Sequence, residues 1–209
     1  MKVRKMQART VERSKAMLAA ATDLFLEKGY ERTSLTEVLD RSKGSRNTLY
    51  ELFGNKEGLL RAMVEEAAAR VWEAVNIDET VEGLTEDGLT RLGCRFVRAV
   101  TDSETVAVYR VVVSQGHRIP EIAELFMASG PTFHAQKMTE LFRRGFDSGD
   151  LRVGTPEQMA RMFFGIILGN LNLRQTTGLP PDWKEEEIEP YVRLAVRVFL
   201  TGTQGLDRN

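Results

Sequence analysis

The chain of 209 residues carries 42% apolar residues and a net charge of −1 at pH 7, a composition typical of a water-soluble protein of one or two domains. Its single cysteine, Cys94, excludes an internal disulfide and a cysteine-based metal site. The longest apolar run, residues 162–171, is about half of the ~20 residues that a membrane-spanning helix needs, and the N-terminus lacks the apolar segment of a secretory signal, so we expect a cytoplasmic protein without a membrane partner.

Positive charge is concentrated near the N-terminus. Residues 1–60 hold 12 Lys and Arg against 8 Asp and Glu, whereas residues 61–209 hold 17 against 22. This distribution suits an N-terminal module that binds nucleic acid, although counts this small are equally compatible with chance. Residues 1–12 form a basic arm, which we expect to be disordered without DNA and able to follow a DNA backbone. The basic residues of this leader are Lys2, Arg4, Lys5, Arg9 and Arg13.

An amphipathic helix is predicted next, over residues 16–28. Its apolar residues share one face: Met17, Ala20, Ala21, Leu24 and Phe25. Gly29 stands where a helix C-cap is expected. Thr33 or Ser34 then caps a second helix, and Glu37 lies three residues after Ser34, as in a capping box.

Residues 35–53 have the pattern of two short helices joined by a tight turn. Gly44 offers the positive φ that a sharp turn requires, and Ser45 is a good N-cap for the helix that follows. The apolar face of the first helix consists of Leu35, Val38 and Leu39. The buried side of the second helix consists of Leu49, Leu52 and Phe53.

The first turn of that second helix, Arg46, Asn47 and Thr48, is left facing solvent. In a helix-turn-helix motif this turn enters the major groove of DNA. Arg can bond guanine N7 and O6, Asn can pair with an adenine edge, and Thr can touch a thymine methyl group. The hydroxyls of Thr33 and Ser45 either contact phosphates or only cap their helices. Any two-helix hairpin with a glycine turn imitates the motif, so the flanking residues decide.

With these flanks included, residues from about 12 to 65 resemble the DNA-binding domain of the TetR family of bacterial repressors. The resemblance rests on Ala20, Ala21, Leu24, Phe25, Gly29, Tyr30, Thr33, Ser34, Thr48, Leu49, Tyr50, Phe53, Lys56, Glu57, Leu59 and Leu60. The turn departs from the family, because Ser42-Lys-Gly-Ser45 stands where Ala-Gly-Val-Ser is common. The resemblance implies that Tyr50 and Lys56 hold DNA phosphates, and Lys56 also begins a helix whose first amides favour an anion.

The rest of the chain shows helical periodicity and no strand pattern. Helices are predicted at residues 56–76, 85–100, 104–115, 121–128, 131–146 and 155–173 and around residues 188–199. The valine run 111–113 could form a strand, but its helical neighbours and the lack of a partner strand favour a buried helix. We predict an all-α fold, with a three-helix helix-turn-helix DNA-binding domain over residues 1–60. A helical ligand-binding and dimerisation body follows over residues 61–209.

The two C-terminal helices are unusually apolar. A capping box and a proline at residues 155–158 begin the first of them, which is apolar nearly all round from residue 162 to residue 173. Gly165 and Gly169 would let another helix approach closely. The last helix repeats apolar residues along one face: Ile188, Tyr191, Val192, Ala195, Val196 and Phe199. The pair could form half of an intermolecular four-helix bundle or only cover the monomer's own core, and the resemblance favours a homodimer.

Little in the sequence points to catalysis, and no cofactor is expected. The chain has two histidines, His117 and His134, and it lacks the zinc-protease, nucleophile-elbow, P-loop and dinucleotide-binding motifs. His134 with Gln136, Lys137 and Glu140 could decorate a pocket, although a lone histidine on a helix is usually structural. Aromatic residues at helical spacing are likewise core residues first.

The sequence therefore favours a homodimeric transcription factor, a repressor that an unidentified small-molecule ligand releases from palindromic double-stranded operator DNA. The helix that begins at Lys56 would connect the DNA to the ligand-binding body, whose pocket residues the sequence does not assign. Two alternatives stay open. One is an all-α enzyme with an incidental helix-turn-helix-like hairpin, and the other is a ligand-independent interaction module.

Overall fold

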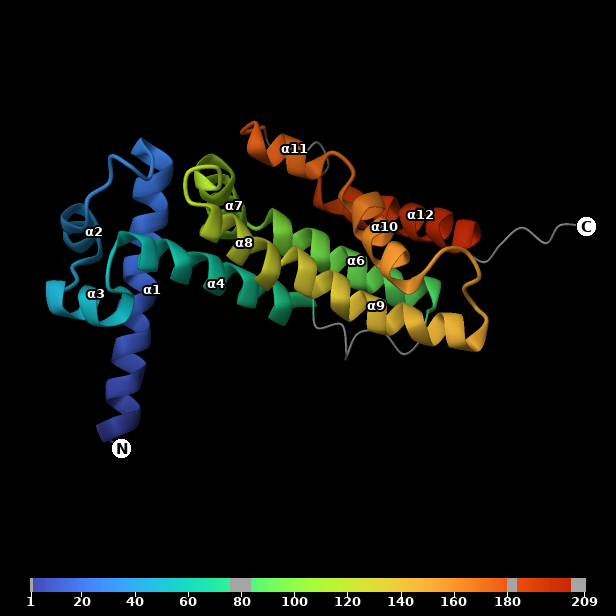
Figure 1. Cartoon of the computed structure of the whole chain (residues 1–209), viewed down its shortest axis with the longest axis horizontal. Coiled ribbons are helices and arrows are strands. Elements are labelled where there is room, and N and C mark those ends of the chain that lie inside the picture. The colour runs from blue at the N-terminus through green and yellow to red at the C-terminus, as the bar shows by residue number, and fades with distance from the viewer. Residues whose placement is uncertain (1, 76–83, 180–183, 204–209) are drawn as a thin grey trace, which may run out of the picture. The chain divides into compact units, whose positions relative to one another are not determined.

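The computed structural model describes residues 2–75, 84–179 and 184–203, with side chains from residue 10 onward, and within these ranges it contains helices and no strand (Figure 1). The all-α prediction is therefore confirmed. The helices are α1 (Lys2–Lys28), α2 (Leu35–Ser42), α3 (Arg46–Phe53), α4 (Lys56–Val75), α6 (Glu86–Thr101), α7 (Ser103–Gln115), α8 (Pro120–Ser129), α9 (Pro131–Ser148), α10 (Pro156–Leu168), α11 (Leu171–Thr176) and α12 (Glu185–Thr203).

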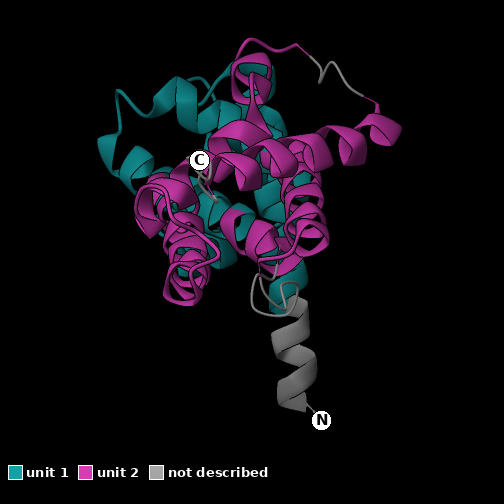
Figure 2. Ribbon diagram, turned by 90° about the vertical axis from the view of Figure 1, so that its right-hand side faces the viewer, with its two compact units in different colours: residues 1–67, 106–126 teal, residues 68–105, 127–209 magenta. Residues whose placement is uncertain are grey.

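The chain divides into two compact units (Figure 2). The N-terminal unit comprises residues 1–67 and 106–126, and the C-terminal unit comprises residues 68–105 and 127–209. The division expected from the sequence fell between residues 60 and 61. By contacts, the N-terminal unit extends seven residues further along α4 and gains the segment 106–126. That segment joins because apolar side chains of α7 and α8 pack into the N-terminal core: Val108, Val111, Val112 and Ile122.

The core of the N-terminal unit is built from the apolar faces of its helices. Met17, Val38 and Leu49 are fully buried, one from each of α1, α2 and α3. Their burial confirms the predicted inner face of each helix. Leu52 does not follow the prediction, because 37% of its surface is exposed. The short helix α3 therefore has a narrower buried stripe than its sequence suggested.

The basic leader is helical rather than the disordered arm that we predicted. Helix α1 begins at Lys2 and continues without a break to Lys28. The reason is that residues 2–28 contain no glycine or proline, so the helix that the apolar face nucleates can propagate back toward the N-terminus. The side chains of Lys2, Arg4, Lys5 and Arg9 lie outside the described part of the structure, and DNA contact by the leader stays a prediction.

In the C-terminal unit, α10 packs against α9, and α12 packs against α6 and α10. The core between them is rich in aromatic and branched side chains. Phe142 and Phe163 are almost fully buried, with ring centroids 5.8 Å apart, and Phe199 of α12 lies 5.5 Å from Phe163. This arrangement holds α12 firmly to its own chain.

The helix predicted over residues 155–173 is broken in the structure. Its start is confirmed, since Thr155 and Gln158 form the expected capping box. Helix α10 nevertheless ends at Leu168, because Gly169 takes φ 50° and ψ −121°, a conformation that helices do not use. A side chain at Gly169 would also lie 2.9 Å from the hydroxyl of Tyr191. The sequence therefore continues as a separate short helix, α11.

None of the helices in the described ranges is both long and apolar enough to cross a bilayer.

Candidate nucleic-acid interface

The turn between α2 and α3 is built differently from the sequence prediction. The residue with a left-handed backbone is Lys43, with φ 53° and ψ 33°, and its amide closes α2 by donating to the carbonyl of Leu39. Gly44 is favoured for another reason. A Cβ atom at this position would lie 2.3 Å from Cε of Met17, so any other residue would force the end of the Met17 side chain to move. The prediction that Gly44 supplies the positive φ is thus wrong.

Both helices of the hairpin start with side-chain caps, as predicted. Ser34 and Glu37 form a reciprocal capping box at α2. At α3, the hydroxyl oxygen of Ser45 accepts from the amide of Thr48 at 3.1 Å and lies 2.7 Å from the hydroxyl of Thr48. These bonds fix where α3 begins and stabilise its first turn. Since both hydroxyls remain near the surface, Ser45 and Thr48 stay available to a phosphate or a base.

Helix α3 presents a polar face to solvent. Leu49 is fully buried and holds the helix to the core, while Arg46 and Asn47 are exposed and Thr48 is half-buried. Tyr50, four residues after Arg46, keeps 52% of its surface exposed. One side of α3 therefore carries a guanidinium, an amide and a phenol, which are all groups that bond to base edges or phosphates.

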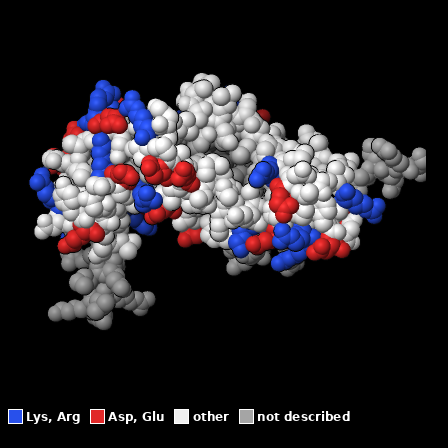
Figure 3. Space-filling view, viewed as in Figure 1, with Lys and Arg blue, Asp and Glu red and all other residues white. Residues whose placement is uncertain are grey.

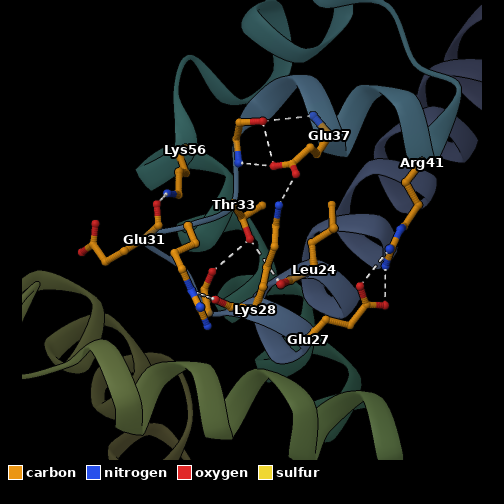
Figure 4. A network of polar contacts seen from close by, with 11 residues as sticks. Leu24, Glu27, Lys28, Glu31, Thr33, Glu37, Arg41 and Lys56 are labelled. Atoms are coloured by element: carbon orange, nitrogen blue, oxygen red, sulfur yellow. Dashed lines mark hydrogen bonds and ion pairs between the residues drawn. The ribbon is translucent and has the colours of Figure 1, made fainter.

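Lys56 at the start of α4 is held by the segment between α1 and α2. Its Nζ donates to the carbonyl of Glu31 at 3.1 Å (Figure 4). The same Nζ lies 4.4 Å from the ring centroid of Tyr30. Partial burial lowers the pKa of Lys56, and the carboxylate of Glu31 acts in the opposite direction. An ammonium group has three donors, so Lys56 can keep these contacts and still bind a phosphate. The side chain of Asn55 caps α4 by accepting from the amide of Gly58 at 2.7 Å.

Thr33 lies inside the fold rather than on the candidate interface. It is 3% exposed. Its hydroxyl donates to two backbone carbonyls, that of Leu24 at 3.2 Å and that of Gly29 at 3.0 Å (Figure 4). These bonds join the end of α1 to the start of α2. The hydroxyl is occupied by this structural role, so Thr33 is not among the contacts that we propose below.

Two ion pairs orient α2 on α1. Arg41 donates two bonds to the carboxylate of Glu27, at 2.7 and 2.8 Å, and Lys28 bonds to Glu37 (Figure 4). The bond from Lys28, followed by those from the backbone and side chain of Ser34, lowers the pKa of Glu37 to about 2. The partners are 14 and 9 residues apart, too far for the sequence pattern to have paired them.

Lys43 is a further candidate that the sequence reasoning missed. It is exposed and lies two residues before the N-cap of α3. The sequence feature that could have identified Lys43 is its positive charge in the turn before α3. On the face drawn in Figure 3, Lys and Arg lie beside Asp and Glu rather than forming an unbroken positive surface.

Comparisons with known proteins agree with this geometry. Residues 17–63 match the family described as bacterial regulatory proteins, tetR family. Residues 87–202 match the C-terminal domain of AefR-like transcriptional repressors. The first match contains α2, α3 and the cluster of ion pairs around them, and the second begins within α6 and ends within α12.

Similar proteins include both repressors and solved structures. The HTH-type transcriptional repressor Rv3405c of Mycobacterium tuberculosis is 31% identical over 130 residues, which are 62% of this chain and 65% of that protein. The match thus spans less than two thirds of the relative's length. A TetR-family transcriptional regulator from Mesorhizobium loti has a TM-score of 0.77 at 23% identity, covering 93% of this chain and 98% of its own. The regulator FrrA has a TM-score of 0.75 at 24% identity, covering 94% and 98%. At these identities the structures share the fold.

Proposed function

The chain belongs to the TetR family of bacterial transcriptional regulators, and from this premise we propose that it is a homodimeric repressor of palindromic operator DNA that a small molecule releases. The observation that carries the proposal is the exposed polar face of α3, with the first turn fixed by Ser45 and the opposite side fixed by Leu49. A helix with this orientation presents its N-terminal side chains to the major groove.

We assign roles on this face by chemistry. Arg46 and Asn47 read base edges, since a guanidinium matches guanine and an amide matches adenine. Thr48 contributes its methyl group at the margin of the helix. Tyr50 and Ser45 bond to phosphates through their hydroxyls, and Lys56 does so through its remaining ammonium donors and the first amides of α4.

The dimer is proposed to form through an exposed apolar stripe on α10 and α12. The apolar pattern of the sequence predicts that this contact contains Phe163, Ile166 and Leu173 as well as Val192, Ala195 and Phe199. Of these, Phe163, Val192, Ala195 and Phe199 are at most 7% exposed and belong to the core of the C-terminal unit, because α12 packs on α6 through that face. The exposed residues are instead Met162, Tyr191, Leu194 and Val198, together with Leu173 on α11.

The spacing of that stripe supports a helical partner. Tyr191, Leu194 and Val198 recur at intervals of three and four residues, which places them on one face of α12. A Cβ atom at Gly165 would meet no heavy atom within 4 Å, so this part of α10 is open to a close approach. A two-fold axis through these helices would pair the same surface on both copies and build a four-helix bundle.

Ligand control is proposed to act on the dimer through the helices that belong to both units. Residues 56–67 of α4 are in the N-terminal unit and residues 68–75 are in the C-terminal unit, so α4 connects them directly. A coupling of about 1–3 kcal/mol would reduce operator affinity by roughly 5- to 150-fold. The similar regulator FrrA is described as flavonoid-responsive, which supports a response to a small molecule here.

Selection of bound duplexes from a random library tests the proposal. We expect enrichment of an inverted repeat whose half-sites are centred about 34–36 Å apart, or one helical turn. Two chains should occupy each repeat. If no sequence is enriched at any salt concentration, the alternatives, an all-α enzyme or an interaction module, would be favoured over a repressor.

A further inference from the structure

A histidine is buried among aromatic rings in the C-terminal unit. His134 lies in the first turn of α9 and is 3% exposed. The centroids of four aromatic rings lie 6.0–6.5 Å from the centroid of the His134 ring: those of Trp72, Phe96, Phe133 and Phe164. These residues come from α4, α6, α9 and α10, so four helices converge on one imidazole.

The hydrogen bonds of His134 define its tautomer. Nδ1 lies 2.8 Å from the carbonyl oxygen of Gly130, and because a carbonyl only accepts, Nδ1 carries the proton and donates it. Burial lowers the pKa of His134 more than this bond raises it, which favours the neutral ring. In that ring Nε2 is an acceptor with a lone pair.

The acceptor Nε2 is buried and has no hydrogen-bond partner among the described residues. A buried acceptor without a donor is destabilising. The rings of Phe96, Phe133 and Phe164 carry no conventional donor, and the indole N–H of Trp72 does not bond to Nε2. The polar residues that follow on α9 do not help. Gln136 is exposed, and Lys137 pairs with Glu140 at 3.4 Å. A phenylalanine ring would pack at this position without leaving an acceptor unpaired. The presence of an imidazole therefore indicates that Nε2 accepts a hydrogen bond from a donor outside the chain.

We propose that this cluster recognises the regulatory ligand, and that the ligand is a flat aromatic molecule with a hydroxyl group, a phenol, whose O–H donates to Nε2 of His134. The inference rests on the ligand-controlled function proposed above and adds the chemical class. Ring edges and faces suit an aromatic guest, and a neutral acceptor selects a donor and disfavours a carboxylate. Trp72 and Phe133 are only half-buried, so the cluster extends to the surface of the unit.

The test uses three naphthalene probes that differ in one group. The 209-residue chain has two tryptophans, Trp72 and Trp183, and the change Trp183→Phe leaves Trp72 as the fluorescent reporter. We expect 2-naphthol to bind about tenfold more tightly than 2-methoxynaphthalene, which has the same rings without a donor. The anion 2-naphthoate should bind more weakly than both.

The variant His134→Phe should bind both neutral probes equally, while keeping an unchanged or higher melting temperature because the unpaired acceptor is gone. His134→Gln retains an acceptor oxygen and should restore part of the preference for 2-naphthol. His117→Phe changes the other histidine, which is exposed in the N-terminal unit, and should leave all three affinities unchanged.

Two kinds of result would overturn the inference. One is equal binding of 2-naphthol and 2-methoxynaphthalene by the protein with His134 intact, or a preference that survives in His134→Phe. The other is no binding of 2-naphthol up to its solubility while the protein still binds its selected operator. The second result leaves the repressor function standing, whereas failure to select any operator removes the function whatever the probes do.

Discussion

The exposed stripe on α12 leads to a quantitative prediction about the dimer. Leu194 is 62% exposed, whereas Val192, two residues earlier, is fully buried. Burying a whole leucine side chain contributes about 1.5–3 kcal/mol, so covering the exposed part of Leu194 contributes roughly 1–2 kcal/mol. A two-fold interface contains Leu194 twice. Leu194→Ala should therefore weaken the dimer by about 2–4 kcal/mol, or roughly 30- to 1000-fold in its dissociation constant.

Sedimentation equilibrium over a range of protein concentrations measures that constant, and urea unfolding of the same samples reports the stability of the chain. Met127→Ala is the matched control, since Met127 is 50% exposed and belongs to α8, a helix that contributes no residue to the stripe. Val192→Ala should instead destabilise the monomer, because it opens a cavity in the core. A wild-type dimer whose dissociation constant is unchanged in Leu194→Ala would show that this stripe is not the interface.

Three further predictions concern the N-terminal unit. Lys56→Ala should weaken binding to all DNA sequences alike and reduce the slope of log affinity against log salt concentration by about 0.9, because one phosphate contact is lost. Lys184→Ala is the control: it changes an exposed lysine of the other unit and should leave both the affinity and the slope unchanged. Gly44→Ala should destabilise the unit by about 1–3 kcal/mol in denaturant unfolding, because its Cβ would overlap Met17 at 2.3 Å; an unchanged midpoint would show that Met17 moves aside freely. Because the folded pKa of Glu37 is about 2 against 4.5 for an ordinary glutamate, its contacts with Lys28 and Ser34 stabilise the fold above pH 4.5 and are lost as the pH falls toward 2. An NMR titration of Glu37 should show this low midpoint, and Lys28→Gln should raise it; a midpoint near 4.5 in the wild type would contradict the pairing.

Features fixed by neighbouring residues were predictable from the sequence. The capping boxes at Ser34 and Thr155 and the cap at Ser45 each act over three residues, and all three are present. Gly29 has the expected positive φ, 86°, after α1. Local chemistry dominates at such positions, because a helix end needs its amides and carbonyls satisfied wherever the helix packs.

Features that depend on contacts between distant segments were not predictable. Gly44 looked like the residue with positive φ, but Lys43 has the positive φ and Gly44 packs closely against Met17 of α1. Thr33 looked like a surface hydroxyl, but the carbonyls of Leu24 and Gly29 bind it inside the fold.

Helix α12 shows the same limit in its apolar pattern. It has two apolar stripes, one through Val192 and Phe199 and one through Leu194 and Val198. Which stripe faces the chain's own core depends on packing against distant segments, so the apolar pattern alone does not decide it. The first is buried against the core of its own unit, which leaves the second for a partner. The candidate site was predictable to a greater extent, because α3 has a single apolar side and its polar face follows directly.

The change Asn47→Ala tests whether the exposed face of α3 reads bases. The change removes an amide and no charge, so it leaves non-specific phosphate binding intact. At one fixed salt concentration, affinities for the selected palindrome and for a scrambled duplex are measured for both proteins. Asn47→Ala should lose about 1–3 kcal/mol of binding free energy on the palindrome, with relaxed preference at one base pair of each half-site, and should bind the scrambled duplex as the wild type does. Equal losses on both duplexes, or no loss on either, would contradict it.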